Sequence, residues 1–584
     1  MKEQFKRNKK IVIILVTLLF FGLVLRAIMG NNLSPSPDET VYGTHAIDFS
    51  KSGAISNQNQ SPVWFYLADI FYKIFGVTLF ASRLTSIIFS TFTILVIFLL
   101  AKELFNKKIA LISSFLFAFS AYSLRIIQME MDATFTFFYL LSVYFFLSKL
   151  FKEDKISLLS ALFYGIAVLT KAISIMLAPG FFLVYLVYFL RYNEKRKNLV
   201  SKENIKRALF SLLIVFILLL PILSYNYLLY KEKGLTDIMF ARFFGISIEI
   251  FEGIAPTMQP FSLTSLVQDG LRASFLFFYR HDLLLLSLSF LGFIYYLLKK
   301  NLKVILLVLT FLPTYFFLSG TSLLDNHFLV FVPLLSLLAA FPLHYLFQIK
   351  FHIRYLFILI LFVIAFFNVY SLRDILGSTS AVGTLRDFVI DNVDESTLVI
   401  ADNRIYGGRI AWMFNDKHYV EVLNLDPILN ELKKSPTSSV SIKTLFIECA
   451  ADDCGFGTIK EGPLNDSMES FSTHFKEKAR KIREFGPGGG DKPEGVYPYF
   501  EVYESRILAK PEILNIVDQT HIWFYYPVRW NLKERIYDSY TPISFFDKSF
   551  DFIATLVLYL SVFIALISPL ILVYLTYKNI NDSP

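Results

Sequence analysis

The chain has 584 residues, of which 55% are hydrophobic and only 18% are charged. That charged fraction is below the quarter that is usual for soluble domains, and apolar runs of about 18 residues or more, each long enough to cross a bilayer, recur along the sequence. The composition excludes an ordinary soluble enzyme and predicts a polytopic α-helical membrane protein. The net charge of +8 does not indicate nucleic-acid binding, because the basic residues cluster in the short loops between apolar runs.

The first apolar run, residues 11–29, follows the basic start MKEQFKRNKK. A signal peptide would begin in the same way, but this run is long and lacks a small-residue cleavage site, so we expect an uncleaved first helix. The fifth and sixth spans share a short turn near Thr170 and Lys171, which leaves the count open by one or two. We predict twelve spans, at 11–29, 79–101, 109–123, 132–148, 156–170, 172–190, 208–230, 282–298, 303–319, 328–347, 355–372 and 550–577.

The distribution of basic residues predicts the orientation in the membrane. With a cytoplasmic N-terminus, and counting only the loops before residue 355, those on the cytoplasmic side carry 23 Lys and Arg residues and those on the other side carry 9, although the latter loops are longer in total. This is the positive-inside pattern. We therefore expect a multi-pass protein of the cell membrane with three large extracytoplasmic segments, at 30–78, 231–281 and 373–549.

The third of these segments is long enough for a domain of its own. LRDFVIDNV has a helical pattern, whereas STLVIADN, SIKTLFIECA and YPYFEVYESRIL have the patterns of strands. We predict a membrane module over 1–375, an extracytoplasmic α/β domain over 376–548, and a final helix with a short cytoplasmic tail over 549–584.

Two further features of this domain can be interpreted from the sequence. FGPGGGDKPEG, at 485–495, indicates a mobile loop; it is not a phosphate loop, because the Lys-Ser/Thr ending and the following helix are missing. The chain has two cysteines, Cys449 and Cys454, and their close spacing outside the cytoplasm favours a disulfide. Two thiols without a nearby histidine do not complete a zinc site.

The stretch SPSPDETVYGTHA, residues 34–46, places two adjacent carboxylates just after the first span. Ser36 suits the N-cap of a helix, Pro37 suits its first turn, and Glu39 stands where a capping box needs an acid. Asp38 and Glu39 can therefore be capping residues or catalytic ones. Tyr42 lies one turn after Asp38, on the same face of such a helix.

Ionisable residues near the membrane are costly and are functional candidates by default. Each also has a plain interpretation: an arginine can anchor a helix end, an acid can stabilise a helix N-terminus, and a histidine can be structural. On the predicted outer side these residues are Arg83, Asp132, Lys171, Arg242, Arg280, His281, Asp282, Asp325 and His327, with the polar Asn326 between the last two. Together with the Asp38–Glu39 pair they predict an outward-facing polar cavity, in which carboxylates activate a hydroxyl and cations balance a leaving phosphate.

The order of these motifs resembles the integral-membrane glycosyltransferases of the GT-C class, in the branch of the protein mannosyltransferases and aminoarabinose transferases. The stretches that carry the resemblance are SPDETVYGTHAIDFSKSG, QSPVWFYLADIFYKIFGVTLFASRLTSIIFSTFTILVIFLLAKELF, IIQMEMDATFTFFYLLSVYFF, AVLTKAISIMLAPGFFLVY and DNHFLVFVPLLSLLAA. They supply the family's Asp-Glu pair with a following Tyr, a proline-aromatic helix, a Gly…Arg pattern, an Asp opening the fourth span, and a Thr-Lys pair. The corresponding residues are Asp38, Glu39, Tyr42, Pro62, Trp64, Gly76, Arg83, Asp132, Thr170 and Lys171.

The resemblance implies a hexosyl- or pentosyl-type glycosyltransferase of the cell envelope with a polyprenyl- or dolichyl-phosphate sugar donor and an acceptor that is a protein, lipid or glycan. Asp38 would be the base of an inverting attack, and Glu39 or Asp132 would help to position the acceptor or a metal ion at the catalytic centre. The donor phosphate would be met by Lys171, Arg242 and Arg83. The supporting or substrate-contacting residues would be Tyr42, His45, Arg280 and His327.

Two departures from the family pattern are visible. Some relatives have a lysine before the juxtamembrane proline, where this chain has Ser61, so other cations must meet the phosphate. The Trp-Trp-Asp signature of oligosaccharyltransferases is absent.

Three questions stay open at this level. A divalent cation, Mg²⁺ or Mn²⁺, could bind Asp38, Glu39 and Asp132, because hard cations prefer oxygen ligands. A transporter or flippase of lipid-linked glycans is the main alternative function, although we find no internal repeat and the ionisable residues gather at one face. A structural assembly protein, whose polar residues only cap and anchor helices, is the third hypothesis.

Overall fold

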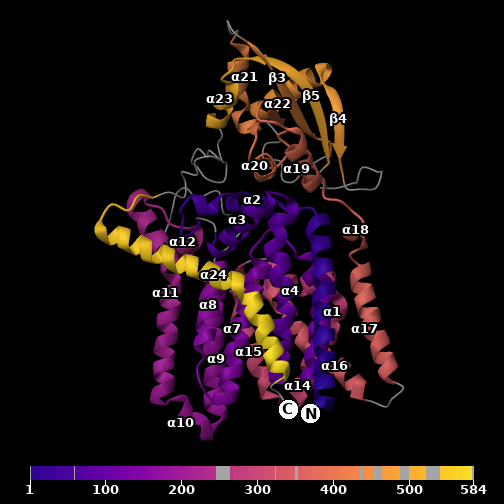
Figure 1. Cartoon of the computed structure of the whole chain (residues 1–584), viewed down its shortest axis with the longest axis vertical. Coiled ribbons are helices and arrows are strands. Elements are labelled where there is room, and N and C mark those ends of the chain that lie inside the picture. The colour runs from indigo at the N-terminus through magenta and orange to yellow at the C-terminus, as the bar shows by residue number, and fades with distance from the viewer. Residues whose placement is uncertain are drawn as a thin grey trace.

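Long apolar helices form an upright bundle, and a small sheet domain stands on one end of it in the computed structural model of the chain (Figure 1). Both chain termini lie at the other end of the bundle (Figure 1). The structure describes residues 2–57, 60–244, 263–321, 324–348, 353–434, 439–451, 454, 462–486, 499–520 and 540–581.

The bundle contains most of the helical residues. Its helices are α1 (Lys2–Asn32), α4 (Leu79–Leu104), α5 (Lys107–Ala118), α6 (Ala121–Arg125), α7 (Asp132–Glu153), α8 (Leu158–Thr170), α9 (Leu177–Arg191), α10 (Arg196–Leu199), α11 (Lys202–Lys233), α14 (Leu271–Leu298), α15 (Leu302–Thr321), α16 (Val332–Gln348), α17 (Ile353–Tyr370) and α24 (Phe545–Asn581). Shorter elements connect them: η2 (Ala172–Met176), η3 (Asn193–Lys195), α12 (Ile238–Phe244), α13 (Leu263–Ser265), the π-helical η5 (Leu266–Gly270), η6 (Asp325–Phe331) and α18 (Arg373–Leu376).

In the described part of the chain, nine helices are long and apolar enough to cross a membrane, and ten if the pair bent by 61° after α17 counts as one span. The sequence predicted twelve spans. The difference lies in 109–123 and 156–170, where α5 and α8 are only 12 and 13 residues long. A helix of that length falls short of the roughly 20 residues that a straight crossing needs. The polytopic helical fold is confirmed, with nine or ten helices of sufficient length for a span among the described residues.

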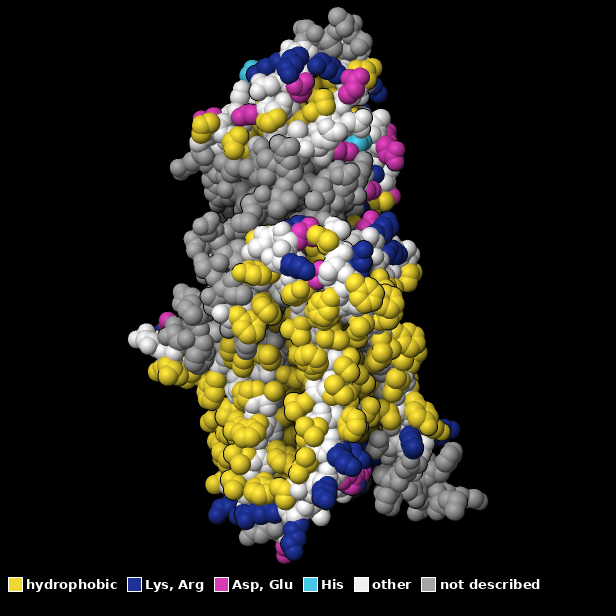
Figure 2. Space-filling model, turned by 90° about the vertical axis from the view of Figure 1, so that its left-hand side faces the viewer, with side chains coloured by type: hydrophobic (Ala, Val, Ile, Leu, Met, Phe, Trp, Pro, Cys, Tyr) yellow, Lys and Arg dark blue, Asp and Glu magenta, His cyan; other side chains and the backbone are white. Residues whose placement is uncertain are grey.

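Burial separates the centre of the bundle from its surface. The apolar windows of α4 and α7 are 83% and 78% buried, whereas those of α1 and α11 are 28% and 22% buried. On the face of the bundle that Figure 2 shows, hydrophobic side chains form a broad band, and Lys and Arg gather at its lower edge, away from the sheet domain. The outer helices therefore face lipid, while α4 and α7 carry their polar residues into the protein interior.

The first connecting segment lies across the upper end of the bundle, beneath the sheet domain (Figure 1). It contains α2 (Pro37–Ala46), η1 (Phe49–Lys51) and α3 (Val63–Phe75). In α3 the residues Val63 to Ala68 are all buried, whereas Ile74 and Phe75 are exposed. The segment is therefore a packed part of the protein and not a free loop.

The sheet domain has five strands in the order β2-β1-β3-β5-β4. β1 pairs in parallel with both β2 and β3, and β5 runs antiparallel to β3 and β4. The three strands and the first helix predicted for this domain are confirmed as β1, β3, β5 and α19; the loop predicted at 485–495 lies largely outside the described residues. The elements are α19 (Ala381–Asn392), β1 (Leu398–Ala401), α20 (Gly407–Met413), β2 (His418–Val420), α21 (Val422–Lys433), β3 (Val440–Cys449), α22 (Pro463–Lys478), β4 (Arg480–Phe485), β5 (Phe500–Ala509) and α23 (Ile513–Thr520).

The sheet domain packs on the first connecting segment through α20. Trp412 is fully buried there, and a Cβ atom added to Gly43 of α2 would lie only 3.0 Å from the Trp412 ring and 2.6 Å from the sulfur of Met129. A side chain at position 43 would therefore push α2 away from one neighbour or the other. One continuous core of buried apolar residues runs from the bundle into α19 and α20, so the two parts form one packed body at this junction.

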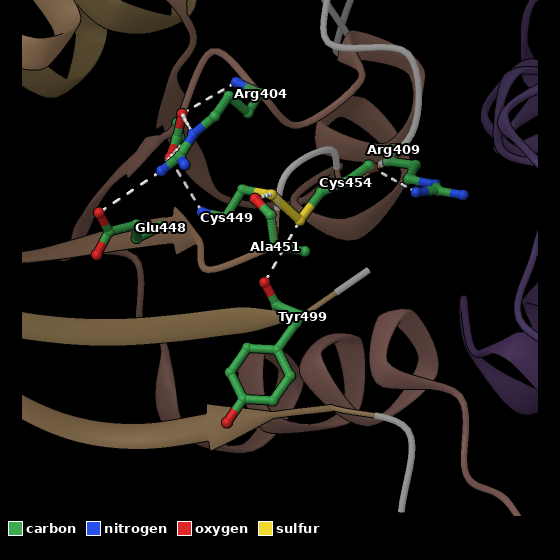
Figure 3. Close-up of a disulfide and its surroundings, with 8 residues drawn as sticks. Arg404, Arg409, Glu448, Cys449, Ala451, Cys454 and Tyr499 are labelled. Carbon is green, nitrogen blue, oxygen red and sulfur yellow. Dashed lines mark hydrogen bonds and ion pairs between the residues drawn. A yellow bond between two sulfur atoms is a disulfide. The ribbon is translucent and has the colours of Figure 1, made fainter. Parts of the chain in front are cut away.

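The predicted disulfide between Cys449 and Cys454 is present, and both cysteines are buried (Figure 3). It closes the turn after β3. The carbonyl of Cys454 accepts a hydrogen bond from Arg409 of α20, and the Cys449 amide donates to Asp402. The disulfide therefore fixes the turn against which α20 is held.

Removal of the disulfide is expected to destabilise the sheet domain moderately. The two cysteines are only 5 residues apart, and closing so short a loop constrains the unfolded chain by about 2 kcal/mol in the chain-entropy description. The Cys449→Ala/Cys454→Ala variant should therefore unfold at a lower temperature than the wild type, and a reducing agent should lower only the wild-type midpoint. Equal midpoints for both proteins under oxidising conditions would contradict this expectation.

Candidate active site

The helix α2 begins with the capping box that the sequence predicted. The Glu39 amide donates to Ser36 Oγ over 3.2 Å, and the Ser36 amide donates to Glu39 Oε1 over 2.9 Å. Pro37 occupies the first turn. The box fixes the direction in which the chain enters α2, and therefore the angle at which Asp38 leaves it.

Glu39 also forms a fully buried ion pair with Arg83 of α4. The guanidinium donates to both carboxylate oxygens, with Nε and Nη2 at 2.8–3.1 Å. Arg83 Nη1 donates to the carbonyls of Gly30 and Leu33 at the end of α1, and the Met129 amide donates to Glu39 Oε2 over 2.8 Å. All three guanidinium nitrogens and both carboxylate oxygens are engaged by protein groups.

This arrangement bears on two of the predicted roles. Arg83 was expected to meet the donor phosphate and Glu39 to act at the catalytic centre. Both side chains have a relative exposure of 0% and a full set of partners, so a substrate could contact either of them only by breaking the pair. The geometry favours a structural role for Glu39 and Arg83.

Asp38 differs from the neighbouring Glu39 in its exposure and in its hydrogen bonding. Its side chain is exposed at the surface, and no hydrogen bond joins it to any other residue that the structure describes. Desolvation by the surrounding protein, and then the neighbouring charge of Glu39, raises the pKa of Asp38 above its ordinary value. An unengaged carboxylate with a raised pKa is suited to accept a proton.

A second acidic residue, Asp132, is almost completely buried. Asp132, at the start of α7, accepts a hydrogen bond from Lys171 Nζ over 2.6 Å. Asn326 donates to Glu130 and, over 3.4 Å, to the second carboxylate oxygen of Asp132. We call these four residues, Glu130, Asp132, Lys171 and Asn326, the inner cluster.

The charge of Asp38 acts on the pKa of Glu130 in the inner cluster and on that of Tyr42. Burial raises the pKa of Glu130 well above its ordinary value, and the charges of Asp132, Glu39 and Asp38 raise it further. The pKa of Tyr42 is raised by burial and by the charges of Asp38, Glu130 and Asp132. Of the residues predicted to form the site, Asp132 and Lys171 are in direct contact, and the grouping of Asp38 and Tyr42 with them stays a prediction.

Glu130 was missed as a candidate, although it lies in the quoted stretch QMEMDATFTFF. Its signal was a second carboxylate two residues before Asp132, in a segment flanked by apolar residues. Asn326 was noticed at the start of its span but was given no role. A side-chain amide that is 8% exposed between two carboxylates is recognisable only once the partners are known.

The remaining predicted residues are placed as follows. His45 is buried, and its Nδ1 lies 3.0 Å from the side-chain nitrogen Nδ2 of Asn57. His327 is buried in η6. Arg280 is exposed on α14. Arg242 lies in α12, and its side chain is outside the part of the chain that the structure describes.

The three carboxylates suggested as metal ligands do not converge on one point. Within the described residues, no group of three or more Asp, Glu, His or Cys side chains is arranged to hold a metal ion. Glu39 turns toward Arg83 and Asp132 toward Lys171, so this set of ligands does not fit a shared cation in this arrangement.

Loss of the Glu39–Arg83 pair should destabilise the fold. Removing one partner leaves the other charge buried and unpaired, which typically costs 3–5 kcal/mol. Glu39→Gln and Arg83→Met should each lower the thermal unfolding midpoint of the purified protein strongly, and the double variant should lose less than the sum of the two.

The matched control is Asp48→Asn, which removes an exposed carboxylate from the same segment and should leave the midpoint unchanged. A Glu39→Gln variant as stable as the wild type would show that the ion pair is not needed for the fold.

The first comparison concerns sequence. Residues 59–225 match the family described as dolichyl-phosphate-mannose-protein mannosyltransferase. This range includes Arg83, Asp132 and Lys171 but not Asp38 or Glu39. No curated protein matches the chain in sequence.

The second comparison concerns structure. The chain resembles ArnT from Cupriavidus metallidurans bound to undecaprenyl phosphate, with 12% identity and a TM-score of 0.53 over 85% of this chain and 98% of that one. It also matches the Archaeoglobus fulgidus oligosaccharyltransferase in the apo form, with 16% identity and a TM-score of 0.43 over 69% of this chain and 63% of that one. The ArnT likeness identifies the fold. The chain therefore has the fold of the GT-C glycosyltransferases and, over residues 59–225, the sequence pattern of the dolichyl-phosphate-mannose-protein mannosyltransferase family.

Proposed function

We propose that this protein is a glycosyltransferase that moves a sugar from a polyprenyl-phosphate donor to a hydroxyl-bearing acceptor, at the membrane face that carries the sheet domain. The observation that carries the proposal is the unengaged carboxylate of Asp38 beside the buried inner cluster. The family match over 59–225 and the fold shared with ArnT, a protein crystallised with undecaprenyl phosphate, support the class of donor.

The adjacent acids Glu39 and Asp38 have different roles in this proposal. Glu39 is held by five protein hydrogen bonds and fixes α2. Asp38 projects from the same rigid turn, and its raised pKa makes it a stronger base than an ordinary carboxylate. A base on a fixed helix can be aimed at a substrate hydroxyl without paying for its own ordering.

The reaction can be written as one displacement. The acceptor oxygen attacks the anomeric carbon and forms the new glycosidic bond, while the acceptor proton passes to a carboxylate oxygen of Asp38. The bond between the anomeric carbon and the phosphate oxygen breaks, and its electrons leave with the polyprenyl phosphate. Attack and departure on opposite faces invert the configuration. The leaving phosphate needs no strong acid, because its own pKa is low.

Lys171 is the cation best placed to meet the departing phosphate. An ammonium group has three N–H donors, and the structure gives Lys171 one described partner, Asp132. Two donors are therefore available to phosphate oxygens. Asp132 holds the ammonium in place, and the sequence suggests Arg242 as a second cation.

Replacement of Asp38 tests the base directly. Asp38→Asn keeps the size of the side chain but removes its basicity, so sugar transfer from a radiolabelled polyprenyl-phosphate sugar in reconstituted vesicles should fall about 10²- to 10⁴-fold. Asp48→Asn is the matched control and should retain full activity. Full activity in Asp38→Asn would remove Asp38 as the base, and transbilayer movement of the intact lipid would favour a flippase.

The pH profile tests the same residue in a second way. The base works only when it is deprotonated, so kcat/KM should fall as the pH drops through the pKa of Asp38. Because desolvation and Glu39 raise that pKa, the acidic limb should lie above the value of about 4 that is ordinary for a carboxyl group. An acidic limb at or below that value would contradict the assignment.

A further inference from the structure

A cavity of about 340 Å³ lies between the first connecting segment, the bundle and the sheet domain. This volume is at the lower end of the range of small-molecule sites. Three parts of the protein contribute polar residues to its wall: the first connecting segment, the bundle and α20. The polar lining residues are Ser34, Ser36, Arg125, Gln128, His281, Asp325 and Arg409.

The cavity adjoins the candidate active site through three separate chain segments. Ser36 lines it, and Asp38 follows two residues later. Gln128 lines it, and Glu130 follows two residues later. Asp325 lines it, and the next residue is Asn326 of the inner cluster. The cavity wall is therefore continuous in sequence with the segment that carries the proposed base and with two segments of the inner cluster.

The charges around the cavity favour an anionic group. Arg125 and Arg409 contribute two guanidinium groups, and one carboxylate, Asp325, opposes them. That carboxylate is already engaged, because His281 Nε2 lies 2.8 Å from its Oδ2, and the other ring nitrogen of His281 lies 3.2 Å from Arg125. Arg125, His281 and Asp325 therefore form a hydrogen-bonded chain, which keeps the Arg125 guanidinium at the wall of the cavity.

Two buried polar atoms of the wall have no hydrogen-bond partner among the described residues. They are Ser34 Oγ and Gln128 Oε1. A buried polar atom left in this state typically costs 1–3 kcal/mol, so a hydroxyl group of a ligand that reached either atom would gain a hydrogen bond. The wall therefore combines hydrogen-bonding groups with positive charge, which suits a molecule that carries hydroxyls and an anionic group.

We propose that this cavity receives the acceptor substrate, and that the acceptor carries a phosphate or carboxylate group that Arg125 and Arg409 bind. The proposal rests on the glycosyltransferase function proposed above. Arg409 belongs to α20 and is held by hydrogen bonds to the carbonyls of Cys454 and Pro35. The sheet domain thereby contributes one wall of the acceptor site.

The position of the cavity distinguishes it from a site for the donor lipid. A polyprenyl chain must remain in the bilayer, whereas the wall of this cavity includes Arg409 of the sheet domain together with residues of the first connecting segment and the bundle. The cation assigned to the donor phosphate, Lys171, belongs to the inner cluster and does not line the cavity. The acceptor and the phosphate of the donor would then be held by different groups of residues, which allows attack and departure on opposite faces of the anomeric carbon.

Equilibrium binding of small probes tests the proposal without turnover. Purified protein in lipid nanodiscs is titrated with glycerol 1-phosphate, with glycerate and with uncharged glycerol. The wild type should bind the anionic probes at least about tenfold more tightly than glycerol, because hydrogen bonds to a charged group are roughly twice as strong as neutral ones. Arg125→Gln should lose most of that preference, and Gln128→Met should weaken all three probes.

The controls separate the acceptor site from the catalytic step. Arg373→Gln removes an exposed arginine outside the cavity and should bind like the wild type. Asp38→Asn should also bind normally, so that a failure of the proposed base leaves this result intact. Arg409→Lys keeps a cation if Arg125→Gln fails to fold, and it should weaken the anionic probes only.

Two outcomes would overturn the proposal. Equal affinity for glycerol and the anionic probes would mean that the cavity holds only water or neutral groups. Competition between glycerol 1-phosphate and a short polyprenyl phosphate, abolished by Arg125→Gln, would assign the cavity to the phosphate of the donor lipid.

Discussion

The upper end of the bundle depends on one buried ion pair, between Glu39 and Arg83. A buried charge is tolerated only when it is paired and fully hydrogen-bonded. The hydrogen bonds of this pair join four segments: the end of α1, the start of α2, the first part of α4, and the residues before α7. The pair therefore fixes the frame within which Asp38 and the inner cluster lie.

This constraint explains how two adjacent acids can have different tasks. The capping box and Arg83 take every oxygen of Glu39, so the helix start is rigid, and Asp38 is left unengaged on the same turn. The sheet domain adds a second support, since Trp412 packs against α2 where position 43 has no side chain. Rigidity at this point benefits catalysis, because a preorganised base needs little reordering when the substrate arrives.

The membrane class and the start of α2 could be predicted from the sequence. Apolar runs and basic loops gave the membrane class, and Ser36, Pro37 and Glu39 predicted the cap, because these signals are local. The partner of Glu39 lies 44 residues away, and no local pattern distinguishes an arginine that holds a carboxylate from one that binds phosphate. Glu130 was missed for the same reason, since its burial and its contact with Asn326 exist only after folding. The sequence also counted α5 and α8 as full spans, because their apolar runs extend past the ends of the helices.

The most direct test of the account is an experimental structure of the protein with a non-hydrolysable polyprenyl-phosphate sugar bound. The account predicts that the anomeric carbon faces Asp38, that the phosphate contacts Lys171, and that the Glu39–Arg83 pair keeps all its hydrogen bonds. A donor phosphate bound to Arg83, with Glu39 released toward the sugar, would contradict the assignment of structural and catalytic roles.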